Sequence, residues 1–179
     1  MANHQLLNNI EHKDLKIITD KSAYFGNNVA YSLVYPFEFK HAQADYPIFF
    51  LQEKDSEKVS PIALFGFSQQ ENLFLDDNGW DATYIPLMIE REPFLIGYQQ
   101  QTGETESQPV VHIDLDSPRV SKESGVPVFL EHGGNSEYIN RVSTILKTIH
   151  DSKASTDLFI NRIQELDLLE PFNLDIQLS

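Results

Sequence analysis

The sequence Tyr46-Pro47-Ile48-Phe49-Phe50-Leu51 decides the fold, together with Ile62-Ala63-Leu64-Phe65-Gly66-Phe67, which follows it. The charged run at residues 53–58 lies between them and predicts a solvated loop that joins two antiparallel strands. Both runs are continuously apolar instead of alternating, a pattern typical of strands that are buried on both faces. We therefore expect a sheet at the centre of the chain whose two faces are both covered.

The sheet extends to either side of this pair of strands. Residues 29–37 are rich in aromatic and β-branched side chains, which favour strands, but Pro36 cannot donate to a ladder. This segment is therefore expected to be an edge strand or an extended loop. Downstream, residues 72–75 continue the sheet, and residues 94–98 and 110–116 are expected as further strands.

A tight turn is expected at Asp76-Asp77-Asn78-Gly79, because an Asn-Gly pair favours positive φ. Trp80 follows the turn directly. We expect Asn78 and Gly79 to take positive φ and the Trp80 ring to be largely buried against Phe65 or Phe74.

Helical patterns dominate the rest of the chain. Residues 81–92 predict a short helix after Trp80. Asn135 or Ser136 can cap an amphipathic helix, and Ser155 or Thr156 can open a second one. The sequence therefore predicts an α+β fold: a mainly antiparallel sheet from the N-terminal two thirds, the short helix, and two amphipathic helices in the C-terminal third, all in one domain of residues 1–179.

The composition excludes several classes of function. The chain has 179 residues with 13 Lys or Arg and 27 Asp or Glu, so its formal net charge is −14, which disfavours nucleic acid and anionic membranes as partners. It has no cysteine, which excludes disulfides, thiolate metal sites and Cys nucleophiles. We find no apolar stretch near the roughly 20 residues of a membrane span and no signal sequence, so a soluble cytoplasmic protein is expected.

Catalytic and metal-binding motifs are weak throughout. No nucleophile elbow, dinucleotide-binding motif or P-loop occurs. His112, Asp114 and Asp116 share one face of a predicted strand and could hold a cation, but the polar face of a half-buried strand is the favoured interpretation. We expect no bound metal, no cofactor and no assignable catalytic residue.

Two further features each allow two interpretations. Arg91 could bind a substrate carboxylate in bidentate fashion, or could pair with Asp81 or Glu71, which we favour because carboxylates are in excess. The segment Glu131-His132-Gly133-Gly134-Asn135 could bind an anion at a helix start or could simply lead into the helix.

Blocks of sequence from about residue 45 to residue 171 resemble a known family. They are Tyr46-Pro47-Ile48-Phe49, Ala63-Leu64-Phe65-Gly66-Phe67, Glu71-Asn72-Leu73-Phe74-Leu75, Asp77-Asn78-Gly79-Trp80-Asp81, Tyr84-Ile85-Pro86, Arg91-Glu92-Pro93-Phe94, Ile113-Asp114, Pro127-Val128-Phe129 and Leu166-Asp167-Leu168-Leu169-Glu170-Pro171. In order and spacing these blocks resemble the SapC family of proteobacterial proteins, which is distinct from the transport permease of the same name. The resemblance implies no catalytic residues, and it implies further helical elements after Pro171. It also implies a gene that lies near genes for TonB-dependent receptors, flavin-dependent halogenase-like proteins and cupin-like oxygenases, as is often the case for members of this family.

Two hypotheses of function follow. The first is a non-catalytic binding or accessory protein that acts with a modifying flavoprotein or oxygenase, or with a TonB-dependent uptake system. Its contact with a partner or a second copy would be through the C-terminal helices, and its candidate binding residues are Glu71, Asn72, Trp80, Asp81, Tyr84 and Arg91. The alternative is an enzyme acting on a small molecule or peptide, with a site of Glu71, Asp81, Arg91, His112 and Asp114. A broad exposed apolar patch would favour the binding protein.

Overall fold

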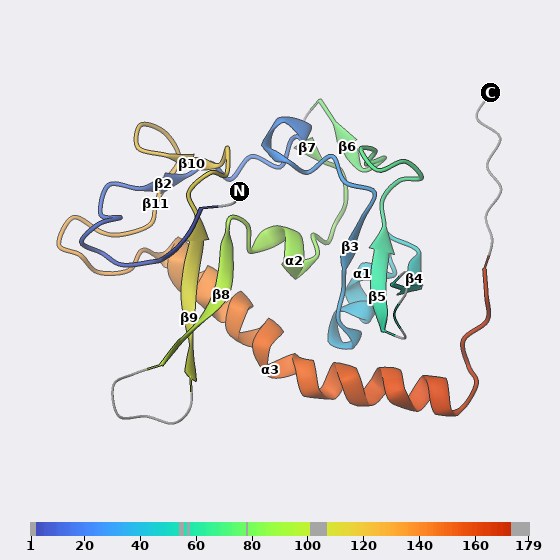
Figure 1. Cartoon of the computed structure of the whole chain (residues 1–179). Coiled ribbons are helices and arrows are strands. Elements are labelled where there is room, and N and C mark those ends of the chain that lie inside the picture. Colours follow the sequence, from blue (N-terminus) through green and yellow to red (C-terminus); the bar gives the residue numbers. More distant parts are fainter. Residues whose placement is uncertain (1–2, 54–55, 57, 78, 101–106, 173–179) are drawn as a thin grey trace.

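The strands lie in two lobes, and one long helix runs beneath both (Figure 1). The computed structural model describes residues 3–53, 56, 58–77, 79–100 and 107–172. The strand pairings within the described residues are all antiparallel. Small antiparallel sheets, a short helix and a C-terminal helix make the fold mixed α+β, which confirms the predicted fold class.

The first lobe contains two three-stranded sheets. One has the order β1 (His4–Leu6), β9 (Ser107–Asp114), β8 (Phe94–Gln100), and the other has the order β10 (Val120–Ser121), β2 (Lys16–Ile17), β11 (Val126–Pro127). Their apolar side chains form one core with the first half of the C-terminal helix, comprising Leu15, Ile17, Phe94, Ile113, Val128, Phe129, Ile139, Val142 and Leu146.

The second lobe is built on the central strands that the sequence predicts. Its sheet has the order β3 (Tyr31–Leu33), β5 (Val59–Leu64), β4 (Ile48–Gln52), and a small hairpin pairs β6 (Leu75–Asp76) with β7 (Gly79–Trp80). Short helical elements are η1 (Ala23–Phe25), η2 (Pro36–Glu38) and α1 (Phe39–Ala42). The core of this lobe comprises Val34, Ala42, Tyr46, Ala63, Phe65 and Ile89.

Two local predictions around proline are confirmed. The segment 29–37 forms the edge strand β3 and then enters η2 at Pro36, because proline suits the first turn of a helix but not a ladder. The short helix after Trp80 is α2 (Leu87–Glu90), and it begins after Pro86, later than the predicted start at residue 81.

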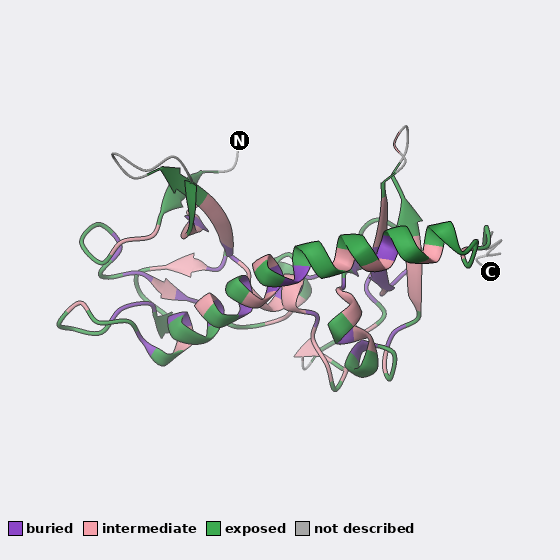
Figure 2. Cartoon of the chain, turned by 90° about the horizontal axis from the view of Figure 1, so that it is seen from below, coloured by how far each residue is buried: buried purple, intermediate pink, exposed green. Residues whose placement is uncertain are grey.

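Helix α3 (Glu137–Glu165) has 29 residues and is about 44 Å long at the usual rise per residue. Ser136 caps it, with its side chain accepting from the Ile139 N–H at 3.3 Å. Figure 2 shows that the helix crosses both lobes, with exposed residues on its outer side. Near its C-terminal end, the ring of Phe159 packs on Phe39 and Phe50 of the second lobe, at centroid distances of 5.9 and 6.5 Å. The helix thus joins the two cores.

The prediction of two C-terminal helices is wrong, because α3 continues through the expected break. The Ser155 hydroxyl donates to the Ser152 carbonyl at 2.9 Å, and the Ser152 hydroxyl donates to the Ile149 carbonyl at the same distance. Both hydroxyls therefore bond within the helix, and neither Ser155 nor Thr156 caps a new one. Packing against both lobes favours one unbroken helix over the local preference for a cap.

The prediction that both faces of the central strands are covered holds only in part, because Ile62 on the outer face is 5% exposed whereas other side chains of that face are not buried. The register pairs Ile48 with Ala63 on the inner face and Phe49 with Ile62 on the outer face. The inner face is covered by the core and by α3. On the outer face, Leu51 and Tyr31 are 37% and 46% exposed. The described residues thus cover one side of this sheet fully and the other only in part, where apolar side chains stay exposed.

No helix in the described part of the chain is both long enough and apolar enough to cross a membrane.

Candidate functional site

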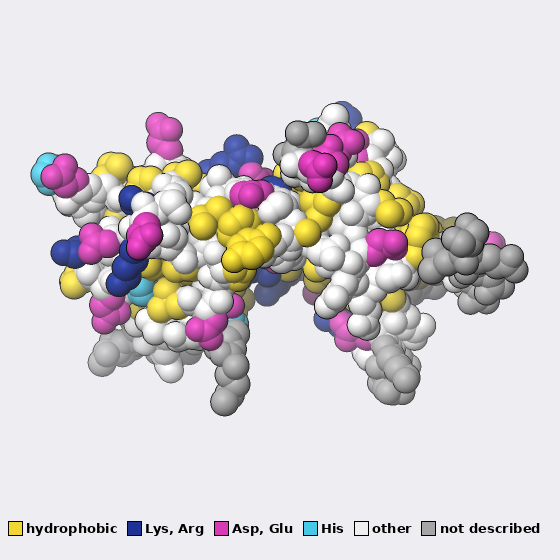
Figure 3. Space-filling model, turned by 90° about the horizontal axis from the view of Figure 1, so that it is seen from above, with side chains coloured by type: hydrophobic (Ala, Val, Ile, Leu, Met, Phe, Trp, Pro, Cys, Tyr) yellow, Lys and Arg dark blue, Asp and Glu magenta, His cyan; other side chains and the backbone are white. Residues whose placement is uncertain are grey.

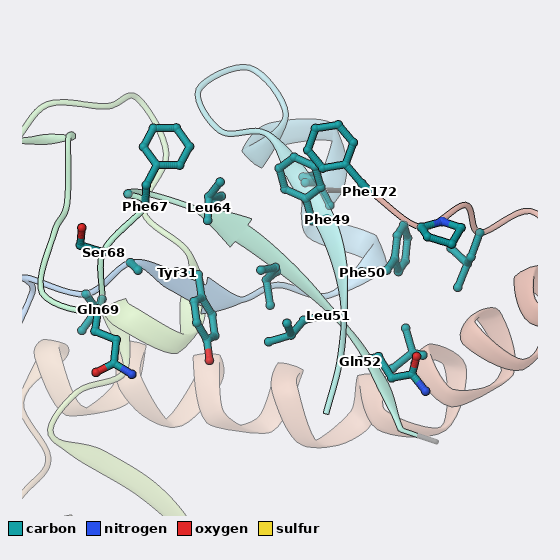
Figure 4. A pocket seen from close by; sticks show the side chains of 18 of the residues that line it. Tyr31, Phe49, Phe50, Leu51, Gln52, Leu64, Phe67, Ser68, Gln69 and Phe172 are labelled. Carbon is teal, nitrogen blue, oxygen red and sulfur yellow. The ribbon is translucent and has the colours of Figure 1, made fainter. Parts of the chain in front are cut away.

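A broad groove lies over the outer face of the β3-β5-β4 sheet (Figure 4). Its volume is about 1440 Å³. We call it the apolar groove and define it by six of the large apolar side chains that line it: Tyr31, Phe49, Leu51, Leu64, Phe67 and Phe172. Figure 3 shows from above that hydrophobic side chains gather in patches on the molecule, between scattered acidic side chains.

Three strands supply the floor of the apolar groove. Because successive side chains of a strand point to opposite faces, the register that pairs Tyr31 with Leu64 and Phe49 with Ile62 places all four on one face. Leu51 lies two residues beyond Phe49 and shares that face. The continuous apolar runs of the sequence therefore supply an apolar outer face as well as the core.

The loop after β5 forms one wall, and Glu71 holds it in place. The Glu71 Oε2 accepts from the backbone N–H of Phe67 at 2.6 Å and of Ser68 at 3.2 Å. A Cβ on Gly66 would lie 2.5 Å from the Glu71 carbonyl oxygen, so this close turn requires glycine. Phe67, which is 51% exposed, is thereby presented at the groove.

The segment that follows α3 forms the opposite wall. After the helix the chain turns at Asp167, whose φ is 52°, and the Leu168 N–H donates to the Ile163 carbonyl at 3.0 Å. Phe172 then stacks on Phe49, with ring centroids 5.3 Å apart and an interplanar angle of 26°. Leu168 and Phe172 are each 63% exposed, so this segment is apolar but only partly covered.

Trp80 lies behind the sheet, at the edge of the second core. Its ring meets the Phe65 ring edge-on at 5.2 Å, which confirms the predicted contact, although Trp80 is half-buried instead of largely buried. Its Nε1 donates to the Tyr46 hydroxyl at 2.7 Å, and that hydroxyl donates to the Tyr84 carbonyl. Burial raises the pKa of Tyr46 to about 12. Gly79 has the predicted positive φ of 112°.

The predicted positive φ at Asn78 lies outside the described residues.

Tyr84 is held by Glu38, a residue that the sequence analysis missed. The Tyr84 hydroxyl donates to Glu38 Oε1 at 2.7 Å, and burial together with this bond raises the pKa of Tyr84. The same oxygen accepts from the Leu87 N–H at 3.0 Å, and Oε2 accepts from the Tyr35 N–H at 2.9 Å. Glu38 is 1% exposed. Its position two residues after Pro36 is the signal that could have found it, because glutamate at this place reaches back to cap a helical turn.

Asn72 and Asp81 occupy different surroundings. Asn72 is buried, donates from Nδ2 to the Asn27 carbonyl at 2.9 Å and accepts from the Phe74 N–H at 3.0 Å. Asp81 is exposed, and its backbone N–H donates to the Phe74 carbonyl at 2.7 Å. Asn72 therefore ties two loops together, whereas the carboxylate of Asp81 faces solvent.

The predicted pairing of Arg91 with Asp81 or Glu71 is wrong. Arg91 Nη1 donates to the Phe94 carbonyl at 2.5 Å, and its Nε contacts the Met88 sulfur at 3.4 Å. Burial lowers the pKa of Arg91. A carbonyl three residues away satisfies this guanidinium locally, so the excess of carboxylates elsewhere does not decide its partner.

His112 and Asp114 lie in the first lobe, on β9. The His112 ring lies over Gly97, where a Cβ would be 2.4 Å from the ring. Asp114 Oδ1 accepts from the N–H groups of Asn3 at 3.2 Å and Asp116 at 3.1 Å. Within the described residues, no group of three His, Cys, Asp or Glu could hold a metal.

The structure therefore does not bring the five residues of the enzyme alternative into one site. Glu71 caps a loop at the apolar groove, Arg91 is half-buried after α2, and His112 lies on a sheet of the other lobe.

The segment before α3 serves as the entry to the helix. Gly133 takes a φ of 81°, and its carbonyl accepts from Asn9 Nδ2 at 2.8 Å. Ser136 then caps the helix, as one of the two predicted caps.

The family model of SapC matches residues 7–179, a longer part of the chain than the sequence blocks above. No curated protein and no solved structure was found to match. Since the family match extends over nearly the whole chain, the protein belongs to the SapC family.

Proposed function

We propose that this chain is a non-catalytic binding protein whose apolar groove takes an extended, apolar segment of a protein partner. One observation carries the proposal: the central strands are apolar on both faces, and the described residues cover the outer face only in part. A sequence of this kind is typical of strands with a layer on each side. The partner segment would supply the second layer.

The exposure of the groove side chains supports an interface. Tyr31 is 46% exposed, Phe67 51% and Phe172 63%, and all three line one groove. Contiguous apolar patches of this kind usually mark a binding surface on an otherwise polar protein, whereas single exposed apolar residues need no explanation. Aromatic side chains are also enriched among the residues that dominate binding energy.

The shape of the groove supports an extended occupant. Strand β4 is at the edge of its sheet, so the backbone edge that does not pair with β5 can accept another strand next to the groove. The chain itself shows the chemistry that the groove accepts, because Leu168 and Phe172 lie along it and Phe172 stacks on Phe49. A partner segment with alternating apolar side chains would fill the remaining space between this segment and the loop of Phe67.

The charge of the chain restricts which charges the partner segment can carry. The net charge is −14, and Glu170, Gln52 and Gln69 are among the polar residues that line the groove. Like charges across an interface oppose association, so the apolar segment of the partner is expected to carry basic residues at its ends.

The proposal changes the expected place of contact. The apolar stripe of α3 is buried by the lobes of the chain itself, at Ile139, Val142, Ile145, Leu146, Ile149 and Ile160. The part of the C-terminal third that is free to contribute is the segment after the helix. The family resemblance points to a modifying flavoprotein or oxygenase, or a TonB-dependent uptake system, as the partner, and we propose a cytoplasmic location. A second copy of the chain is the competing occupant.

Selection from a displayed peptide library tests the proposal. The full chain serves as bait, and Leu51→Glu serves as the groove variant. Leu158→Glu is the matched control, because Leu158 is 72% exposed and lies on α3 outside the groove. We expect selected peptides to alternate apolar residues, to carry basic ends, and to bind the control variant like the wild type but not Leu51→Glu. Peptides that bind all three proteins equally would contradict the proposal. A stable dimer by light scattering that Leu51→Glu dissociates would assign the groove to a second copy.

A further inference from the structure

One end of the apolar groove is already occupied by a side chain of the chain itself. The ring of Phe172 stacks on the ring of Phe49, with centroids 5.3 Å apart and an interplanar angle of 26° (Figure 4). Ile62, which lies opposite Phe49 in the register, is buried, whereas Leu51 and Tyr31 on the same face are exposed. The outer face of the sheet is therefore closed around Phe49 and open farther along.

A defined turn directs Phe172 onto this strand. At the end of α3 the Leu168 N–H donates to the Ile163 carbonyl, and the Asp167 N–H donates to the Gln164 carbonyl, each at 3.0 Å. Together with the φ of 52° at Asp167, these two bonds form the Schellman motif that commonly ends a helix. The motif sets the direction in which the chain leaves α3, so the position of Phe172 follows from a specific local structure.

The segment that carries Phe172 is held on the sheet by few contacts. We call residues 168–172 the Phe172 segment. Beyond the turn, residues 169–172 make no hydrogen bond with any other described residue. Leu168 and Phe172 are both mostly exposed, and Pro171 has no N–H to donate. Segments with few buried contacts and few hydrogen bonds open most easily in a folded protein. The stack on Phe49 is therefore one that another ring can replace.

The chemistry of the stack indicates which side chain can replace Phe172. Aromatic pairs attract each other beyond the area that they bury, so the face of the Phe49 ring favours another planar apolar ring over an aliphatic side chain. An extended partner segment that fills the open part of the groove and continues along β4 reaches Phe49, because Phe49 and Leu51 share one face of that strand. To continue there, it must take the place of Phe172.

We propose that Phe49 forms an aromatic subsite at the end of the apolar groove. Phe172 occupies this subsite in the free chain, and the partner segment displaces Phe172 with an aromatic side chain of its own. The subsite rests on the binding function proposed above, and it gives the partner segment a required type of side chain. It also makes the chain its own competitor, since the Phe172 segment lowers the affinity for the partner until it is displaced.

Dye binding tests the occupancy of the subsite without any partner. The probe is Nile red, an uncharged dye that brightens on exposed apolar surface and is not repelled by the net charge of −14. Phe172→Ser should raise its fluorescence, and adding Leu51→Glu should remove the increase. Leu158→Ser is the matched control, because Leu158 is also exposed but lies outside the groove, and it should give no increase. Equal fluorescence of Phe172→Ser and the wild type would overturn the proposal.

A second variant opens the subsite with the Phe172 ring intact. In Asp167→Pro the residue cannot take a positive φ and has no N–H for the Gln164 carbonyl, so the turn is lost. The ring is then no longer directed onto Phe49. Asp167→Pro should raise the dye fluorescence as Phe172→Ser does, and an unchanged signal would contradict the role of the turn in filling the subsite.

The peptides selected with the full chain test the displacement. Each aromatic peptide is titrated against the wild type and Phe172→Ser, beside a matched peptide in which leucine replaces the aromatic residue. We expect the aromatic peptides to bind Phe172→Ser about fivefold more tightly than the wild type, the factor that corresponds to the roughly 1 kcal/mol of an exposed aromatic pair. The leucine peptides should show no such difference.

The outcomes separate this proposal from the proposed function. Weaker binding of the peptides to Phe172→Ser would make Phe172 a fixed wall of the groove, and would overturn the displacement while the binding function stands. Selected peptides without an aromatic residue, or equal affinities for the two proteins, would do the same. If no peptide is selected, the binding function fails and the displacement fails with it, whereas the dye results still decide whether Phe172 fills the subsite.

Discussion

The ring of Phe172 lies nearly parallel to the ring of Phe49, although 123 positions separate them in the sequence (172 − 49), and the centroids are 5.3 Å apart. This stack attaches the segment after α3 to the edge strand of the second lobe. It also marks the outer face of that strand as a surface on which apolar side chains pack. The proposed binding function begins from this relationship.

Phe172→Ala is expected to lower the free energy of unfolding by about 1 kcal/mol, the value of an exposed aromatic pair. Phe172 is 63% exposed, so little buried area is lost. Urea denaturation measures the change, with Leu168→Ala as the neighbouring control. A loss of more than 3 kcal/mol would mean that the segment is part of the core.

Glu38→Gln is expected to destabilise the fold by about 2 kcal/mol, because hydrogen bonds to a charged acceptor are among the stronger ones. The carboxylate accepts from Tyr84, Leu87 and Tyr35, and its residue is 1% exposed. Tyr84→Phe should cost about 1 kcal/mol. The double variant should cost less than the sum of the two, which chemical denaturation would detect as coupling. Strict additivity would contradict the role assigned to this bond.

Trp80→Ala is expected to cost about 3 kcal/mol, the lower end for a large aromatic, since the ring is only half-buried. The loss comes from the contact with Phe65 and from the bond to Tyr46. Trp80→Phe should keep part of the first and lose the second. Thermal and chemical denaturation give the values, and an unchanged stability with loss of partner binding would instead make Trp80 an interface residue.

Two serine variants report on the continuity of α3. Ser136→Ala should cost about 1 kcal/mol, because Ser136 caps the helix, whereas Ser155→Ala should change stability by less than about 0.5 kcal/mol. Equilibrium unfolding of the two variants side by side makes the comparison. A cost of about 1 kcal/mol at Ser155 would indicate that a second helix starts there after all.

The stability of the chain should depend on pH through Lys21. Burial, with Arg119 nearby, lowers the pKa of Lys21 from 10.5 to about 8, while Glu92 and Glu90 act in the opposite direction. Between these two values the unfolded chain binds the proton and the folded chain releases it, so this residue makes the fold more stable as the pH rises from about 8 toward 10.5.

Melting curves of the wild type and Lys21→Gln between pH 7 and about 10 isolate this contribution. The difference in stability between wild type and variant should shift in favour of the wild type across the interval. A difference that stays constant with pH would contradict the burial of the ammonium group.

Local patterns predict much of this fold. Three of the predicted features depend on only a few adjacent residues: the turn at Gly79, the edge strand that ends before Pro36, and the helix cap at Ser136. The described residues contain all three. The apolar runs around Phe49 and Leu64 likewise predict their strands. Backbone preference and side-chain period act over a few residues, so the sequence carries them directly.

The tertiary structure decides which residues, distant in the sequence, each element contacts. The Tyr84 hydroxyl donates to Glu38, which is 46 positions away in the sequence, and Arg119 donates to the carbonyl of Ile18, which is 101 positions away. Contacts of this kind also keep α3 unbroken and decide that the outer face of the central sheet is covered only in part. The sequence by itself determined the central strands, the start of α3 at Ser136, the acidic charge and the family. Only the fold decided which apolar side chains stay exposed and which carbonyls the buried Arg119 meets, because packing and burial are properties of neighbours in space.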